Sequence, residues 1–238
     1  MQLRIWNELF DHHPDLVLGV IAVHGLDNSQ DQPEIVTLLR EAEASVPPRL
    51  GTGPLAEHPR IAPWREAYRR FGAKPKKYPS SIENLVKRVS KGASLAPIND
   101  LVALYNTVSL RHLLPVGGED LAAVQGDLEL AIAGGDEPAV LLLGEREPRA
   151  PYAGEIFYKD AQGAVCRRWN WKEADRTKLT HETTRAVLVV ESIPPTERSE
   201  LEAAVEDLAG LLVQFGLVAG DGVKTSILDR GNPIVPLD

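Results

Sequence analysis

The chain has 238 residues, of which 43% are apolar and 25% charged, a composition typical of an ordinary globular protein. Its net charge of −8 and pI near 5.3 exclude a general binder of polyanions. The longest apolar stretch, residues 16–23, is far shorter than the ~20 residues that cross a bilayer. The N-terminal segment has no signal-peptide pattern, so we expect a cytoplasmic protein without a membrane partner.

The first half of the chain reads as mainly helical. Residues 16–24 are rich in β-branched side chains and end at Gly25, which predicts a buried strand followed by a turn. A helix is expected from Pro33 to about residue 46, because Pro suits a first helical position and the apolar residues recur at helical spacing.

Three more helices are expected between residues 61 and 113. In residues 61–71, Trp64, Tyr68 and Phe71 share one face. Ser80 and Glu83 form a capping-box pattern, which predicts a helix that runs to Gly92. The third helix is expected over residues 99–113.

The second half reads as strands followed by one helix. Short apolar runs separated by turn residues predict strands at 128–132, 139–143, 155–158, 165–169 and 186–191. Residues 197–215 have a helical period. Helices gathered before strands favour an α+β fold. We expect one domain over residues 1–215 and an extended surface tail over residues 216–238.

The basic residues are concentrated in one segment. Residues 60–91 contain ten basic and only two acidic side chains, a charge of +8, so the other 206 residues carry −16. This pattern fits a protein that contacts one stretch of phosphate backbone, and it fits a solvated helical face equally well.

Two segments stand out as candidate binding regions. Residues 72–81 form a proline-stiffened loop with three lysines and Tyr78, suited to phosphates and to stacking on a base or ribose. Residues 166–181 gather two of the four tryptophans with polar and cationic side chains at the end of a predicted strand. A charged surface connection and ordinary tryptophan packing are the alternatives.

Standard catalytic signatures are missing from the sequence. There is no Walker loop, dinucleotide fingerprint or Gly-x-Ser-x-Gly elbow. None of the six histidines is paired at the i, i+4 spacing, and Cys166 is the only cysteine, so we expect neither a metal site nor a cofactor. Cys166 is expected to be a buried apolar residue.

Five groups of residues together form a recognisable pattern: Phe71–Pro75 with Lys77, Pro97–Val102 with Tyr105 and Asn106, Leu114–Asp120, Arg168–Trp171 and Thr177–Thr180. This pattern resembles the stand-alone B3/4 domain proteins, a family related to the editing module of the phenylalanyl-tRNA synthetase beta subunit. The resemblance covers about residues 1–215 and implies a three-layer α+β fold with a β-sandwich of unusual topology. It also implies a hydrolase that cleaves the ester of a wrongly charged aminoacyl-tRNA, and it does not imply aminoacylation.

The match to the editing module is partial at the residue level. Gly117 stands where the family has its usual catalytic histidine. His112 is near in sequence but is not the matching position. Asp175 lies nearest to the pocket glutamate of the family, without the glycine pair that precedes it there.

Hydrolysis of an activated ester needs only a positioned water and hydrogen-bond donors for the oxyanion. Ester hydrolysis without a metal is therefore still possible although the family's histidine and pocket glutamate are not kept. We expect Asp175 to orient the water, and Asn106 and Thr177 to assist catalysis. The expected substrate-binding residues are Asn99, Asn170, Trp171 and Thr180; the residues expected to bind the tRNA acceptor end are Arg69, Arg70, Lys74, Lys76 and Lys77.

The expected partner is tRNA, with an aminoacyl-tRNA synthetase as a further candidate and no DNA. Two other functions stay open from the sequence. One is a non-catalytic module that binds RNA or an amino acid, favoured by Gly117. The other is an enzyme acting on a small amino-acid-like molecule, whose activity salt would hardly affect, whereas RNA binding weakens steeply with salt.

Overall fold

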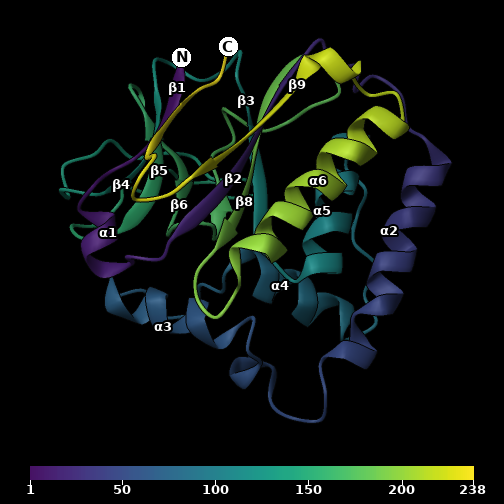
Figure 1. The fold of residues 1–238 in the computed structure, drawn as a ribbon. Helices are drawn as coiled ribbons and strands as arrows, with labels where there is room; N and C mark the ends of the chain where they lie inside the picture. Colours follow the sequence, from purple (N-terminus) through teal and green to yellow (C-terminus); the bar gives the residue numbers. More distant parts are fainter.

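A computed structural model describes residues 1–238, which form ten strands and six helices (Figure 1). The helices are α1 (Leu9–His12), α2 (Pro33–Ser45), α3 (Ala62–Arg70), α4 (Ser81–Val89), α5 (Asp100–His112) and α6 (Arg198–Gln214). The strands are β1 (Gln2–Ile5), β2 (Val17–His24), β3 (Val116–Asp120), β4 (Leu128–Ile132), β5 (Ile156–Asp160), β6 (Gly163–Arg167), β7 (Lys172–Glu173), β8 (Arg185–Ser192), β9 (Val223–Leu228) and β10 (Ile234–Pro236).

These elements build three layers. A four-stranded antiparallel sheet, in the order β3-β8-β2-β9, lies between the helices α2, α5 and α6 and a six-stranded sheet in the order β10-β1-β4-β5-β6-β7 (Figure 1). In the six-stranded sheet only β1 and β4 run parallel. The α+β class and the three layers expected from the sequence are confirmed.

The middle sheet is buried on both faces, which explains the continuous apolar runs of β2 and β8. Helix α6 packs on β2 at Gly19, where a Cβ atom would lie 2.2 Å from Cγ2 of Val205. A glycine at this position therefore allows the helix layer to approach the sheet.

The C-terminal segment is part of both sheets. It is extended, as expected, but β9 pairs with β2 and β10 pairs with β1. Leu228 and Leu237 are fully buried. Residues 216–238 thus complete the sheets and do not form a free surface tail.

Local sequence signals explain most helix starts. The Ser80 hydroxyl accepts a hydrogen bond from the Glu83 amide, as the capping-box pattern predicts. The Glu83 carboxylate does not close the box, because it pairs with Arg65 on α3. Asn99 caps α5 through a 2.9 Å bond from the Val102 amide.

Some expected strands differ in the structure. Residues 139–143 form only isolated bridges, of Val140 with Arg149 and of Leu142 with Ala174. The strand expected over 165–169 ends at Arg167, because Arg168 and Trp169 adopt left-handed backbone conformations. No helix is both long and apolar enough to cross a bilayer.

Candidate functional site

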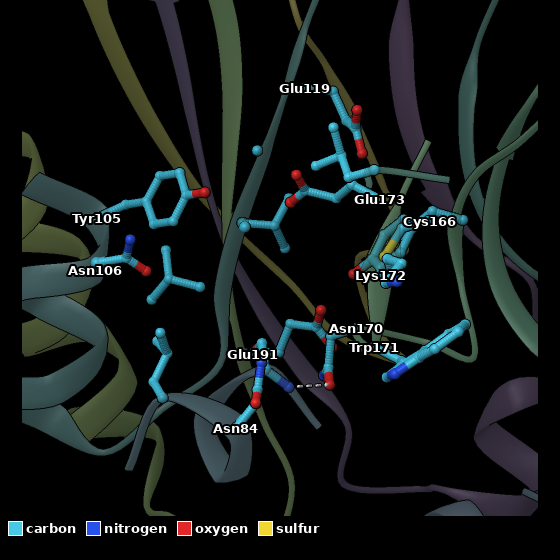
Figure 2. A pocket seen from close by; sticks show the side chains of 18 of the residues that line it. Asn84, Tyr105, Asn106, Glu119, Cys166, Asn170, Trp171, Lys172, Glu173 and Glu191 are labelled. Atoms are coloured by element: carbon cyan, nitrogen blue, oxygen red, sulfur yellow. Dashed lines mark hydrogen bonds between the residues drawn. The ribbon is translucent and has the colours of Figure 1, made fainter. Parts of the chain in front are cut away.

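A cavity of about 380 Å³ lies between the two sheets. Strands β3 and β8 supply one wall, β4 to β7 the other, and α4 and α5 close the space from the side (Figure 2). Side chains 187, 189 and 191 of β8 point into the cavity because alternate residues of a strand share one face. The polar and aromatic lining residues are Ser81, Asn84, Arg88, Tyr105, Asn106, Glu119, Tyr158, Asn170, Trp171, Lys172, Glu173 and Glu191.

Three carboxyl groups face this cavity, and none of them forms an ion pair with a lysine or arginine. Figure 2 shows Glu119 and Glu173 at one end, and Glu191 with Asn170 at the other. Glu119 and Glu191 are only 6% and 4% exposed. Buried carboxyl groups without a cationic partner favour the protonated state.

Glu191 is the best connected of the three. Its Oε2 accepts a 3.1 Å hydrogen bond from the Asn170 side-chain amide, whose Oδ1 accepts a 2.8 Å bond from the Tyr68 hydroxyl. The Asn170 carbonyl also accepts a bond from the Ser81 amide at the start of α4. Burial raises the pKa of Glu191 to about 8, against the effect of its hydrogen-bond donors. Glu191 is thus a fixed carboxyl group that titrates near neutral pH.

Glu173 and Glu119 influence each other at the opposite end. Burial raises the pKa of Glu173 to about 7, and burial followed by repulsion from Glu173 raises the pKa of Glu119 well above its usual value. Oε2 of Glu119 is buried and has no hydrogen-bond partner. The Tyr158 hydroxyl, which also lines the cavity, lies beside Glu191 and lowers the pKa of that carboxyl group.

Two glycines of β3 make room for these side chains. A Cβ atom on Gly117 would lie 3.1 Å from Oε1 of Glu173. A Cβ atom on Gly118 would lie 2.5 Å from Cδ2 of Leu188 and 2.8 Å from the Val187 carbonyl oxygen. The space that a side chain at position 117 would fill is therefore occupied by the Glu173 carboxyl group.

Trp171 connects the cavity to the loop of residues 72–81, which we call the lysine loop. The indole ring meets the Tyr78 ring edge-on, with centroids 4.8 Å apart. The Arg168 guanidinium lies 3.7 Å from the centroid of Tyr78 and 4.6 Å from that of Trp171. These contacts join the lysine loop to the Glu191 end of the cavity.

The left-handed backbone at Arg168 and Trp169 creates this arrangement. Their φ angles are 48° and 64°, which is costly for non-glycine residues and needs support from packing. Trp169 is fully buried and packs edge-on against Trp64, with centroids 5.2 Å apart. Burial of Trp169 thus fixes the turn that presents Arg168, Asn170 and Trp171.

The basic residues fall into two groups. Lys74, Lys76 and Lys77 are exposed and form no ion pair, and Lys77 lies 5.1 Å from the Tyr78 ring centroid. Arg69 and Arg70 of α3 are exposed as well, but both pair with Glu66. The lysine loop therefore carries uncompensated positive charge beside the cavity. Arg88 of α4 adds a further cationic side chain in the lining of the cavity itself.

The seven residues predicted from the sequence to bind substrate or assist catalysis also fall into two groups, those that line the cavity and those that do not. Asn106, Asn170 and Trp171 line the cavity together. The other four, Asn99, Asp175, Thr177 and Thr180, do not line it.

Asp175 lies outside the cavity because the chain leaves β7 after Glu173. The Ala174 amide bonds to Val165 and the Asp175 amide to Leu141, so the strand does not continue its alternation. The Asp175 carboxylate is 43% exposed and pairs with Lys178 at 2.8 Å.

The remaining three predicted residues support the frame of the site. Thr177 is buried and its hydroxyl lowers the pKa of the neighbouring Glu119. Asn99 caps α5 and donates from its side chain to the Leu179 carbonyl at 3.2 Å. The Thr180 carbonyl accepts a bond from the side chain of Asn28.

Sequence reasoning missed the three glutamates as site residues. Glu191 follows Val187 and Val189 at strand spacing, so a carboxyl group on a buried face was the available signal. For Glu119 and Glu173 no local signal existed, since only the packing of β3 against β7 brings them together. Cys166 also lines the cavity, and burial raises the pKa of its thiol well above the usual value, so it is a thiol and not a thiolate.

No group of three or more histidine, cysteine, aspartate and glutamate side chains is arranged to hold a metal ion.

Comparison with known families identifies the domain. The B3/4 domain family matches residues 63–216, more than half of the chain. This chain belongs to the B3/4 domain family. The matched part of the B3/4 domain runs from α3 to α6 and contains every lining residue of the cavity.

The B3/4 domain is also similar to a solved structure, an N-terminal fragment of the phenylalanyl-tRNA synthetase beta-subunit from Pyrococcus horikoshii. The TM-score is 0.46 and the sequence identity is 12%. The match covers 94% of this chain and 49% of that one, so this chain spans about half the length of the fragment. No curated protein matches the sequence.

Proposed function

We propose that this B3/4 domain hydrolyses the ester bond of wrongly charged aminoacyl-tRNA. The aminoacyl group enters the cavity between the sheets, and the lysine loop holds the acceptor end of the tRNA. The observation that carries the proposal is the contact of Trp171 with Tyr78, which joins a polar cavity to unpaired lysines.

The acceptor end is held by charge and by aromatic rings. Lys74, Lys76 and Lys77 contact phosphates, while Arg168 and Tyr78 face the terminal nucleoside. Arg69 and Arg70 contribute less, because Glu66 already neutralises part of their charge. A synthetase that releases the misacylated tRNA is the corresponding protein partner.

Glu191 takes the role of the base that the sequence suggested for Asp175. In its ionised form it accepts a proton from a water molecule, whose oxygen attacks the ester carbonyl carbon. Asn170 holds the Glu191 carboxylate through Oε2 and so fixes its position relative to this water. A base with a pKa near the working pH is efficient in this role.

Amide side chains stabilise the charge that develops on the carbonyl oxygen. Asn84 of α4 lies near Glu191, and Asn106 of α5 lines the cavity beside Tyr105 (Figure 2). Both amides donate to this oxygen. The bond from the carbonyl carbon to the ribose oxygen then breaks, and this oxygen leaves with the proton from Glu191. The products are the free amino acid and uncharged tRNA.

The test is single-turnover deacylation of a panel of misacylated tRNAs by the wild type and by Glu191→Gln. We expect hydrolysis of at least one ester by the wild type and a loss of about 100-fold or more in the variant. Glu206→Gln, on the exposed face of α6, is the matched control. Equal rates for wild type and Glu191→Gln would exclude the assigned base.

A non-catalytic binding module is the second candidate, and Gly117 favours it because it leaves the family's histidine position without a side chain. Binding of tRNA together with no hydrolysis of any ester in the panel would select this function.

A further inference from the structure

The Glu119–Glu173 end of the cavity has no role in the ester cleavage described above. Two carboxyl groups meet there, and neither has an ion pair with a lysine or arginine of the chain. Arg176 lowers the pKa of Glu119, but its guanidinium is bonded to Asp160 through two hydrogen bonds of 2.9 and 2.6 Å. This end of the cavity therefore offers two carboxyl groups that a cation entering the cavity would favour in their ionised form.

Glu119 also has a buried oxygen without a partner at this end of the cavity. Its Oε2 makes no hydrogen bond, although the residue is only 6% exposed. Buried polar groups are rarely left unpaired, because each costs about 1–3 kcal/mol. Glu119 lies in the cavity lining, where a bound hydrogen-bonding group can reach it.

The shape of the cavity allows a ligand to reach this end. Gly117 and Gly118 leave the β3 wall without side chains, and the 380 Å³ volume extends from Asn170 and Glu191 to Glu119 and Glu173 (Figure 2). An aminoacyl group whose ester lies at the Glu191 end therefore directs its side chain toward the two carboxyl groups.

We propose that Glu119 and Glu173 bind a cationic side chain, so that the domain selects esters of basic amino acids, those with a side-chain ammonium or guanidinium group. This inference rests on the proposed function for the orientation of the ligand. An apolar side chain would leave the two carboxyl groups desolvated and unpaired, whereas an ammonium group satisfies them with charge-assisted hydrogen bonds.

The test compares two small ligands that differ in one charge. L-lysinamide and L-norleucinamide are titrated into the protein by calorimetry at pH 7.5. We expect lysinamide to bind at least about 10-fold more tightly, as for a charge-assisted hydrogen bond. Glu119→Gln and Glu173→Gln should reduce this preference to about threefold or less, and Glu206→Gln should retain it.

A second variant covers the case in which a glutamine variant does not fold. Gly117→Ala places a Cβ atom against Oε1 of Glu173 and should reduce the preference by displacing that carboxyl group. Equal affinities for the two amides, tighter binding of the neutral L-tyrosinamide, or no binding of lysinamide at millimolar concentration would overturn the inference.

These outcomes are separate from those of the deacylation assay. Lysinamide binding without hydrolysis of any aminoacyl-tRNA would refute the proposed function and retain the cation site. Hydrolysis restricted to esters of neutral amino acids would retain the proposed function and refute the cation site.

Discussion

The indole ring of Trp171 stands edge-on to the phenol ring of Tyr78, with centroids 4.8 Å apart. Trp171 lines the cavity, and Tyr78 belongs to the lysine loop. Two segments almost a hundred residues apart in sequence thus form one continuous surface, with Arg168 stacked over both rings. A ligand held by the loop is placed at the cavity.

Replacing Trp171 with alanine should weaken binding of tRNA. Loss of one stacking partner costs about 1–3 kcal/mol, or roughly 5- to 150-fold in Kd. Trp6→Ala is a matched control, because Trp6 is a half-buried indole away from the cavity, with Lys159 over its ring. Fluorescence anisotropy with a labelled acceptor-stem hairpin measures both variants. Equal weakening by the two substitutions would show a loss of stability and no specific role of Trp171.

The lysine loop should make binding of tRNA strongly dependent on salt. We expect the combined Lys74→Ala, Lys76→Ala, Lys77→Ala variant to bind more weakly and to lower the slope of log K against log salt by about 0.7 per lost phosphate contact. The combined Arg198→Ala, Lys224→Ala, Arg230→Ala variant changes the net charge equally at another surface. The control variant should keep the wild-type slope; a similar fall in both slopes would show that the lysine loop does not hold the phosphates.

Deacylation should increase with pH up to about pH 8. Glu191 acts as a base only when ionised, and burial raises its pKa to about 8. Below that value kcat/KM should fall about tenfold per pH unit. The profile is measured against uncatalysed ester hydrolysis at each pH. A plateau that extends unchanged down to pH 6 would show that Glu191 is not the base.

Glu191→Gln should increase stability at neutral pH although it removes activity. The folded protein holds the Glu191 proton up to about pH 8 and the unfolded chain only up to about 4.5, so ionisation destabilises the fold as pH rises between these values. Glutamine has no charge to desolvate. We expect a gain on the order of 1 kcal/mol or more at pH 7.5 and little at pH 4. Urea unfolding at both pH values measures it, and a constant difference would contradict this explanation.

Two glycines in the layer of α6 and β2 should respond oppositely to alanine. Gly19→Ala brings a Cβ atom against Val205 and should destabilise the fold by about 1–3 kcal/mol. Gly210 lies in the exposed part of α6 with no atom within 4 Å of a Cβ, so Gly210→Ala should stabilise by roughly 0.5–1 kcal/mol. Thermal unfolding compares the two, and a neutral Gly19→Ala would show that α6 can move away from the sheet.

The helices could be predicted from local signals because those signals act within a few residues. Ser80 caps its helix as the sequence predicts, and the helix expected from Asn99 begins there because Asn99 caps it. Short strands such as β1 and β10 gave no period, since they are held by pairing with distant segments. The end of β6 was misplaced because the left-handed turn at Arg168 and Trp169 depends on tertiary packing.

In the candidate site, too, local sequence signals predicted some residues, whereas others depend on tertiary packing. Asn170 and Trp171 were identifiable because they follow a strand in a polar cluster. Asp175 belongs to that cluster in sequence, but the chain turns away from β7 and exposes it. Glu119 and Glu173 become site residues only when the two sheets face each other, a relationship that lies beyond any local pattern.

The most direct measurement is a crystal structure with a non-hydrolysable substrate analogue, an adenosine that carries an amino acid in 3′-amide linkage. The account predicts that the aminoacyl group lies between Asn106 and Glu191 and that the adenine contacts Tyr78 or Trp171. An analogue bound outside the cavity, or with its adenosine away from the lysine loop, would contradict it.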